Sequence, residues 1–318
     1  MHRSRGFTLI ELVVSIAVIG ILISIILPAI QAARNAGRKL ECANHLKQLS
    51  LAMLNYEARH HSLPPFTVPN SYSAWAHLLP DLEMKSLFRQ INFSLPYSIG
   101  GGTPLVAASS LESSNPLPIL ECPSDSSSKP PGANYGVNWG GSGLLAEPNG
   151  VFRSAILGPS RLSEVRDGLS HTALVSEWIR GSNQFVPMVS AVDRTEPLAL
   201  VFNLLPGSST QSDFPLLASQ CRSLDTATAF ILFSNRGLQW LEGSPWQSGY
   251  NHLATPNSNT CANNGDSRGG ALSAASYHSG GVNVALADGA VRFVTSTIDV
   301  SIWRSLGSRN GSESNHAF

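Results

Sequence analysis

The sequence predicts an α+β protein, in which a long N-terminal helix carries a β-rich, loop-rich globular body with antiparallel sheet. Three observations predict this class. An uncharged apolar run spans residues 12–30, and a helical pattern continues it to about residue 60. Most of the 27 glycines and 20 prolines come after that point, which is typical of a body with many turns. Near the C-terminus, apolar and polar residues alternate on both sides of a turn signal at Asp288-Gly289, as in a β-hairpin.

Composition limits the classes of partner. The chain has 318 residues, with 21 Lys+Arg and 21 Asp+Glu, so its formal net charge is zero. Charged residues make up 13%, about half of the ~25% that soluble globular proteins carry. A nucleic-acid-binding protein needs a basic excess to displace counterions, so we expect no nucleic-acid partner. The 42% of hydrophobic residues can form a core, which argues against a long disordered chain.

The apolar run is long enough to cross a membrane. As a helix, residues 12–30 would be about 29 Å long, close to the ~30 Å hydrocarbon core of a bilayer. A secretory signal peptide has a shorter apolar core and then a small-residue cleavage site, whereas this run follows Glu11 directly and continues into a helix. Arg3 and Arg5 precede the run, so the positive-inside rule places the N-terminus in the cytoplasm.

The residues before the run carry a specific motif. Residues 6–11 read Gly-Phe-Thr-Leu-Ile-Glu, which resembles the leader of type IV prepilins and type II secretion pseudopilins. The resemblance implies that a prepilin peptidase cuts between Gly6 and Phe7 and methylates the amine of Phe7. It also implies an inner-membrane protein whose body is periplasmic or extracellular, and a helix kink at Pro28. An ordinary membrane anchor is the competing interpretation.

Glu11 has two interpretations. A carboxylate within an apolar helix is costly unless it is paired, so such residues are usually functional. In a staggered bundle of these helices, the expected partner is the Phe7 ammonium of a neighbouring subunit, and the pair would set the axial register. In an isolated molecule, Glu11 would lie at the lipid headgroup boundary. Both can hold, before and after assembly.

The second half of the helix is expected to pack on the body. Apolar residues recur at spacings of 4, 3, 4 and 3, which places them on one helix face. They are Cys42, Leu46, Leu49, Met53 and Tyr56. Leu63-Pro64-Pro65 ends the helix.

The expected organisation is therefore a leader over 1–6, a helix over 7–60 that is embedded in the membrane to about residue 30, a globular body over 61–306 and a flexible polar tail over 307–318. Two short helices are expected over 73–92, a connector without strong periodicity over 94–118, and mainly strands from residue 134. Residues 214–224 and 226–232 are ambiguous between helix and strand. Thr297 is the expected cap of a last helix that runs through Leu306 and is stopped by Gly307.

Several blocks in order resemble one large family over almost the whole chain: bacterial pilin-like proteins of unknown function with a C-terminal H-x9-D-G box. The matching blocks are residues 42–48, 73–75 with 78–80, 122–125, 167–168 with Thr172 and Glu177, 251–252 with 256–257 and Cys261, and His278 with 288–289. His45 stands where the family more often has asparagine, and Ala254-Thr255 interrupts a proline-rich run. The family has no established biochemical activity.

The four cysteines lie in the part expected outside the cytoplasm, so we expect disulfides. Three pairings are possible. We favour Cys42–Cys122 and Cys221–Cys261, because Cys42 lies on the helix face that should meet the body. A metal site is the weaker interpretation, since there is no C-x-x-C and Cys42-x-x-His45 has no matching second half. No metal or other cofactor is expected.

Catalysis has little support in the sequence. His278 and Asp288 could be two-thirds of a catalytic set, but no G-x-S-x-G elbow accompanies them, and hairpin geometry alone explains Asp288-Gly289. We expect no enzyme, and a structural or ligand-contact role for His278. His60-His61 is expected to be a solvated helix end. Residues 263–266 form an oxygen-rich loop without EF-hand spacing, which leaves calcium binding open.

Two functions follow as hypotheses. The first is a membrane-anchored, pilin-like or pseudopilin-like subunit that joins other such subunits and their assembly machinery. The alternative is a surface solute- or glycan-binding protein that uses the helix only as an anchor. In that case Trp240 and Trp246, on either side of Glu242-Gly243, would stack on an extracellular glycan, although core packing is the competing role for most of the tryptophans.

Overall fold

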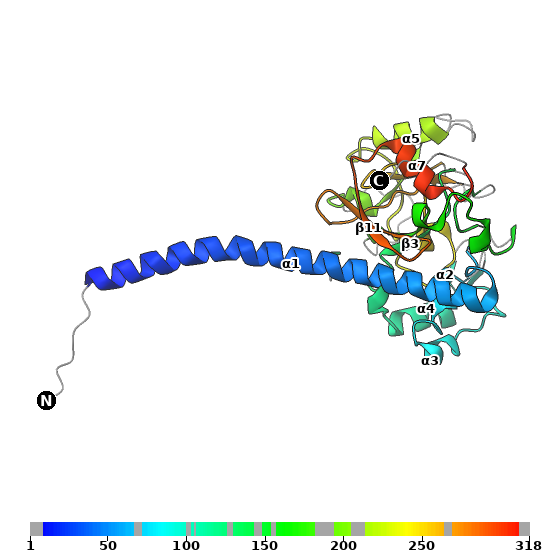
Figure 1. Cartoon of the computed structure of the whole chain (residues 1–318), viewed down its shortest axis with the longest axis horizontal. Helices are drawn as coiled ribbons and strands as arrows, with labels where there is room; N and C mark the ends of the chain where they lie inside the picture. Colours follow the sequence, from blue (N-terminus) through cyan, green and yellow to red (C-terminus); the bar gives the residue numbers. More distant parts are fainter. Residues whose placement is uncertain are drawn as a thin grey trace.

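The protein consists of one long helix that projects from a globular body (Figure 1). The computed structural model describes residues 9–66, 72–99, 103–104, 106–125, 130–142, 148–153, 157–181, 194–204, 214–263 and 269–311. The expected cleavage site between Gly6 and Phe7, part of the oxygen-rich loop and the last residues of the tail lie outside these ranges. The α+β class is confirmed.

Helix α1 spans Leu9–His60. Its first half projects away from the body, whereas its second half lies along the body's surface (Figure 1). The buried residues are those of the apolar stripe and their neighbours, namely Cys42, Leu46, Leu49, Ser50, Ala52 and Met53. The helix ends where His61 adopts a left-handed conformation, with φ of 54°, just before Pro64-Pro65. His60 and His61 are both exposed, as expected for a solvated helix end.

The larger sheet has five strands in the order β11-β10-β4-β3-β7. Their bounds are β3 Tyr135–Asn138, β4 Ala173–Glu177, β7 Gly249–Tyr250, β10 Gly281–Leu286 and β11 Val291–Thr295. All neighbours are antiparallel except β3 and β7.

The middle of this sheet is covered on both faces, so all six residues of β10 are buried. Ala285 belongs to the same apolar cluster as Leu46 and Leu49 of α1. Val282 and Val284, on the opposite face, pack with Trp303 of α7 (Val300–Gly307). The expected alternation is therefore present, but it separates two buried faces instead of a buried and an exposed one.

A second sheet has four strands in the order β6-β5-β8-β9. Their bounds are β5 Val201–Leu204, β6 Ile231–Phe233, β8 Thr260–Asn263 and β9 Gly270–Ala271. Helix α5 (Phe214–Arg222) packs on it, and Cys221 of α5 forms a disulfide with Cys261 of β8. The two ambiguous segments are thus a helix, α5, and a loop that leads into a strand, β6.

Short elements complete the body. The helices are α2 Ala74–Leu78, α3 Lys85–Phe88, α4 Val106–Ser114 and α6 Pro245–Ser248, and the two-residue strands β1 Ser98–Ile99 and β2 Thr103–Pro104 pair with each other. Single 3-10 turns cover Pro118–Leu120, Leu162–Glu164, Leu169–His171 and Pro197–Ala199. The two helices expected around Pro80 are α2 and α3.

Three expectations need correction. The connector over 94–118 contains the nine-residue helix α4, whose small and serine-rich residues give little periodic signal. The cap of α7 is Asp299 and not Thr297, because the Asp299 carboxylate accepts from the backbone N–H groups of Ser301 and Ile302. The chain is also held beyond Gly307, since the Arg309 guanidinium donates to the carbonyls of Pro148 and Gly150.

Candidate functional site: the N-terminal helix and its junction with the body

The first half of α1 is apolar and uncovered. Its large apolar side chains are exposed by 45–80% of their surface. They are Leu9, Ile10, Leu12, Val13, Val14, Ile16, Val18, Ile19, Ile21, Leu22, Ile23, Ile25, Ile26, Leu27 and Ile30. The helix is long and apolar enough to cross a membrane. An apolar surface of this size, present on all sides of a helix, requires lipid or other helices around it.

Glu11 lies in the first turn of α1 and is exposed. The partial positive charge of a helix N-terminus favours a carboxylate there. The Ser15 hydroxyl donates to the backbone carbonyl of Glu11. The Phe7 amine, which the sequence analysis pairs with a neighbour's Glu11, lies outside the described residues.

The second half of α1 is fixed to the body at several points. Cys42 forms a disulfide with Cys122, the pairing that the sequence analysis favours. The Lys47 ammonium donates to the carbonyl of Gly289 at 2.6 Å, at the tip of the β10–β11 hairpin. Near the end of the helix, Arg59 forms an ion pair with Asp81. These contacts hold the body against one face of α1.

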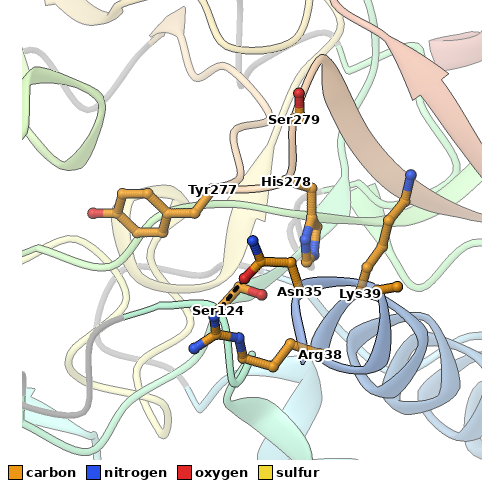
Figure 2. Close-up of a pocket in the computed structure, with 8 residues that line it drawn as sticks. Asn35, Arg38, Lys39, Ser124, Tyr277, His278 and Ser279 are labelled. Carbon is orange, nitrogen blue, oxygen red and sulfur yellow. Dashed lines mark hydrogen bonds between the residues drawn. The ribbon is translucent and has the colours of Figure 1, made fainter. Parts of the chain in front are cut away.

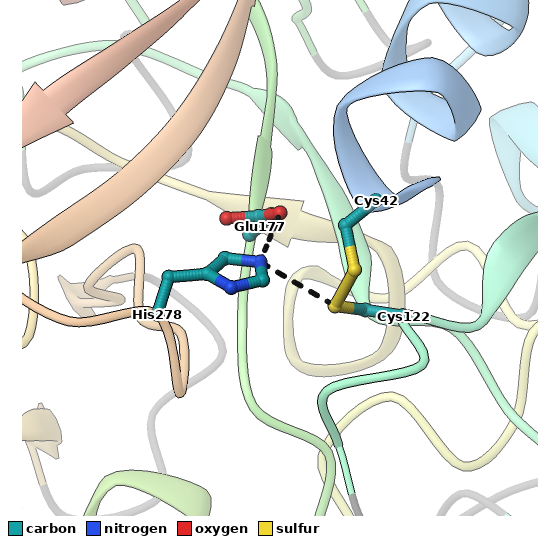
Figure 3. Close-up of side chains that lie close together, drawn as sticks. All are labelled: Cys42, Cys122, Glu177 and His278. Carbon is teal, nitrogen blue, oxygen red and sulfur yellow. Dashed lines mark hydrogen bonds and ion pairs between the residues drawn. A yellow bond between two sulfur atoms is a disulfide. The ribbon is translucent and has the colours of Figure 1, made fainter. Parts of the chain in front are cut away.

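His278 lies beside the first disulfide (Figure 3). Its Nε2 atom is 3.2 Å from Oε1 of Glu177 and 3.7 Å from Sγ of Cys122. The two oxygens of Glu177 also accept from the side-chain amide and the backbone N–H of Asn283, at 2.8 and 2.7 Å. The carboxylate partner of His278 is therefore Glu177 of β4. Asp288 is exposed in the hairpin turn, where it accepts from the backbone N–H of Ala290.

Four side chains at this junction lie close enough together to be the ligands of a metal ion, judged by distance alone. Ligand atoms of Cys42, Cys122, Glu177 and His278 all lie within 4.8 Å of one another. Zinc and related ions bind cysteine as the thiolate. Because the two sulfur atoms are bonded to each other, neither is a thiolate in this structure. The set as it stands stabilises the junction of α1 with the body and offers no thiolate ligand.

Two comparisons with protein families bear on identity. Residues 31–301 match the family described as a protein of unknown function, DUF1559, and residues 1–27 match the prokaryotic N-terminal methylation motif. The chain belongs to the DUF1559 family. No curated protein and no solved structure matches it. The methylation motif and the apolar helix together make this DUF1559 protein a prepilin-like, membrane-anchored chain.

In this DUF1559 protein the tryptophans do not form the surface expected for sugar stacking. Trp139, Trp178 and Trp240 are each no more than 1% exposed, so their rings belong to the core. The hypothesis that Trp240 contacts a glycan is therefore wrong, because a ring enclosed on both faces offers no surface to a ligand. Trp246 is partly buried and packs against Phe233, with ring centroids 5.5 Å apart.

Pro28 lies inside helix α1, and the kink expected there stays a prediction. Helix α1 is continuous through Pro28 and curves gradually along its length (Figure 1). Proline has no N–H to donate to the carbonyl four residues earlier, so this position keeps one helical hydrogen bond fewer than its neighbours.

Glu177 is the residue of the junction to which the sequence analysis gave no role. In the structure it lies in a strand with no exposed residue, and a carboxylate buried in such a strand needs specific partners.

Proposed function

We propose that this protein is a pilin-like subunit that prepilin peptidase processes and that assembles with other pilin-like subunits, through α1, into a fibre or a type II secretion-type pseudopilus. The observation that carries the proposal is the uncovered apolar half of α1 directly after a methylation motif. A helix of this kind is stable in lipid before assembly and among neighbouring helices after it.

Glu11 supplies the specific contact of the proposed assembly. Cleavage between Gly6 and Phe7 leaves a new α-amino group four residues before Glu11. In a bundle of staggered helices, this cation would pair with the Glu11 carboxylate of a neighbour. An unpaired carboxylate inside an apolar bundle is costly, so the pair would select the one axial offset at which both charges are satisfied.

The rest of the chain supports a matching location. Arg3 and Arg5 favour a cytoplasmic N-terminus in the inner membrane, with the body periplasmic or extracellular. The two disulfides agree with a periplasmic or extracellular body, because disulfides persist in oxidising compartments. We propose a structural role without catalysis, since the buried His278–Glu177 pair is explained by its contacts to Asn283 and the disulfide.

Substitution of Glu11 tests the proposal. The full chain would be expressed in its host as wild type, as Glu11→Ala and as Glu41→Ala, and the amount recovered in sheared surface fibres and in subunit crosslinks would be measured. Glu41 is an exposed carboxylate on the same helix, outside the apolar run, and is the matched control. We expect Glu11→Ala to lose assembly and Glu41→Ala to keep it. A processed Glu11→Ala chain that assembles like the wild type would contradict the proposal.

The alternative, an anchored solute- or glycan-binding protein, keeps one supporting observation. The burial of Trp240 removes its main argument, but a cavity of about 380 Å³ lies where α1 meets the body. Polysaccharide binding by the detergent-solubilised full chain, weakened by Trp246→Ala, would favour this alternative over assembly.

A further inference from the structure

The cavity at the junction of α1 with the body has no part in the proposed assembly (Figure 2). Its volume, about 380 Å³, lies in the range of small-ligand pockets, roughly 300–1,000 Å³. Side chains from α1, from the loop after Cys122 and from the loop before β10 line it. In Figure 2, Asn35, Arg38 and Lys39 lie on α1, and Tyr277, His278 and Ser279 lie on the loop before β10.

The helix side of the cavity is cationic. The Arg38 guanidinium donates to the Asn35 side-chain oxygen at 2.6 Å, and this bond orients the guanidinium. A guanidinium has five N–H donors, so further donors can serve a ligand. The Lys39 ammonium lies 3.1 Å from the centroid of the Phe293 ring, a cation–π contact that leaves its hydrogen-bond donors available. The two cations are adjacent in sequence and both line the cavity.

The carboxyl groups near the cavity already have partners. Glu196 forms a hydrogen bond with the Tyr277 hydroxyl, on the body side. Asp125 lies 3.5 Å from the Arg180 guanidinium. Glu177 lies behind His278 and accepts its Nε2 proton. The cavity therefore presents two cations from α1 toward a wall whose acidic groups are engaged elsewhere.

His278 adds a ring nitrogen to the lining of the cavity. Its side chain is only 3% exposed, and Nε2 faces the Glu177 carboxylate and the disulfide sulfur. The ring lines the cavity, and Nδ1 is the ring nitrogen that does not take part in these two contacts. An imidazole nitrogen at a cavity wall can donate to or accept from a ligand. The Ser124 and Ser279 hydroxyls line the same space.

We propose that this cavity binds a phosphate group. Its lining combines a guanidinium, an ammonium, hydroxyls and a ring nitrogen, and an anion with several acceptor oxygens can satisfy all of them together. The volume also leaves room for a glycerol or sugar attached to the phosphate. A neutral sugar would leave the charges of Arg38 and Lys39 without a counterpart.

Position along α1 suggests where the phosphate comes from. Arg38 lies eight residues beyond Ile30, or about 12 Å along the helix. The headgroup layer extends about 5–8 Å beyond the hydrocarbon core, and the long Arg38 side chain can reach back toward it. With α1 in a membrane, a lipid headgroup would supply the phosphate. A soluble phosphate ester offers the same chemistry, and the experiment distinguishes the two.

Phosphorus NMR of the full-length protein in non-ionic detergent tests the site, with inorganic phosphate as the probe. We expect the wild type to broaden the phosphate signal in a saturable manner. Arg38→Gln combined with Lys39→Gln should weaken binding at least about tenfold, because two charge-assisted contacts are lost. Arg34→Gln, an exposed cation on the same helix that does not line the cavity, is the matched control and should change binding less than about twofold.

A second variant separates the cavity from surface charge. Ser279→Tyr keeps every charge and fills part of the cavity, so it should also weaken binding. Equal binding by wild type, the double variant and Ser279→Tyr would overturn the proposal, and so would the absence of phosphate binding by the wild type.

Two competition arms identify the source. Displacement of phosphate by phosphatidylglycerol in the micelles assigns the site to a lipid headgroup. Displacement by soluble glycerol phosphate alone assigns it to a free phosphate ester. Because binding is measured on the unassembled chain, failure of this proposal leaves the assembly of α1 untouched, and failure of assembly leaves the cavity result standing.

Discussion

The Nε2 atom of His278 lies 3.2 Å from the Glu177 carboxylate, which joins the loop before β10 to the middle of the sheet beneath α1. The disulfide of Cys42 and Cys122 lies on the other side of the same ring nitrogen. A residue of the C-terminal H-x9-D-G box, a buried strand and the long helix therefore meet at one point, and the contacts there determine how the body is held on its anchor.

Removal of the Glu177 charge should destabilise the body. Its oxygens accept from His278 and twice from Asn283, and a glutamine at this position would turn an N–H₂ group toward one of these donors. We expect Glu177→Gln to lower the free energy of unfolding by about 2–4 kcal/mol in urea denaturation. Asp288→Asn, in the exposed turn, is the control and should cost less than about 0.5 kcal/mol. A larger effect at Asp288 than at Glu177 would restore the His278–Asp288 pairing considered from sequence.

Each disulfide should contribute measurably to stability. Cys42–Cys122 closes a separation of 80 residues and Cys221–Cys261 one of 40. The chain-entropy relation gives about 4 kcal/mol for each, slightly more for the longer loop. Replacement of both cysteines of a pair by alanine, followed by denaturant unfolding, measures this. We further expect only the loss of Cys42–Cys122 to expose the second half of α1 to limited proteolysis. Equal protease sensitivity of the two variants would show that this disulfide does not hold the helix.

Buried carboxyls should make the protein less stable as pH rises above neutrality. Desolvation raises the pKa of Glu112 to about 8 and that of Glu242 to about 7, from a usual 4.5. Their folded-state pKa values lie above the unfolded ones, so their stabilising contribution is complete below pH 4.5 and is lost as pH rises through 7–8.

Buried histidines act in the opposite direction. Desolvation lowers the pKa of His77 to about 4 and that of His252 to about 3, from 6.5. Their contribution is present above pH 6.5 and is lost as pH falls toward 3–4. The carboxyl and histidine contributions to the free energy of unfolding, added together, predict a stability plateau between about pH 4.5 and 6.5, with losses on either side. Glu112→Gln should reduce the loss between pH 6.5 and 8 in thermal unfolding, and Glu83→Gln, an exposed control, should not. A Glu112→Gln curve that parallels the wild type above pH 6.5 would be evidence against the buried-carboxyl explanation.

The cap of α7 gives a local test. Asp299 accepts from two backbone N–H groups of the first turn, whereas the Thr297 hydroxyl donates to the Thr295 hydroxyl. We expect Asp299→Ala to cost about 1 kcal/mol and Thr297→Ala to stay within about 0.5 kcal/mol of the wild type. The reverse order in the same denaturation assay would favour the assignment made from sequence.

Much of this fold follows from local sequence. The stripe from Cys42 to Tyr56, the last hairpin and the helices around Pro80 were predicted because periodicity and turn residues act within a few residues of each other. The burial of the second face of β10 could not be predicted, because it depends on α7, a helix that packs on the sheet from the side opposite to α1.

The junction was predicted only in part. The cysteine pairing favoured from the helix face is the one in the structure. The pairing of His278 with Glu177 joins residues about a hundred positions apart, and nothing local in the sequence indicates it. Trp240 stands among glycine and serine, as surface aromatics often do, yet tertiary packing encloses it. The cavity likewise forms between α1 and two distant loops, so no single motif marks it.

The central claim is that this chain is processed and assembled as a pilin-like subunit. Mass spectrometry of the N-terminal peptide, from protein isolated from its native membrane, tests the claim most directly. A peptide that begins at Phe7 and is one methyl group heavier than its sequence is the predicted result. A peptide that begins at Met1 or His2, or at a residue beyond Ile30, would contradict it.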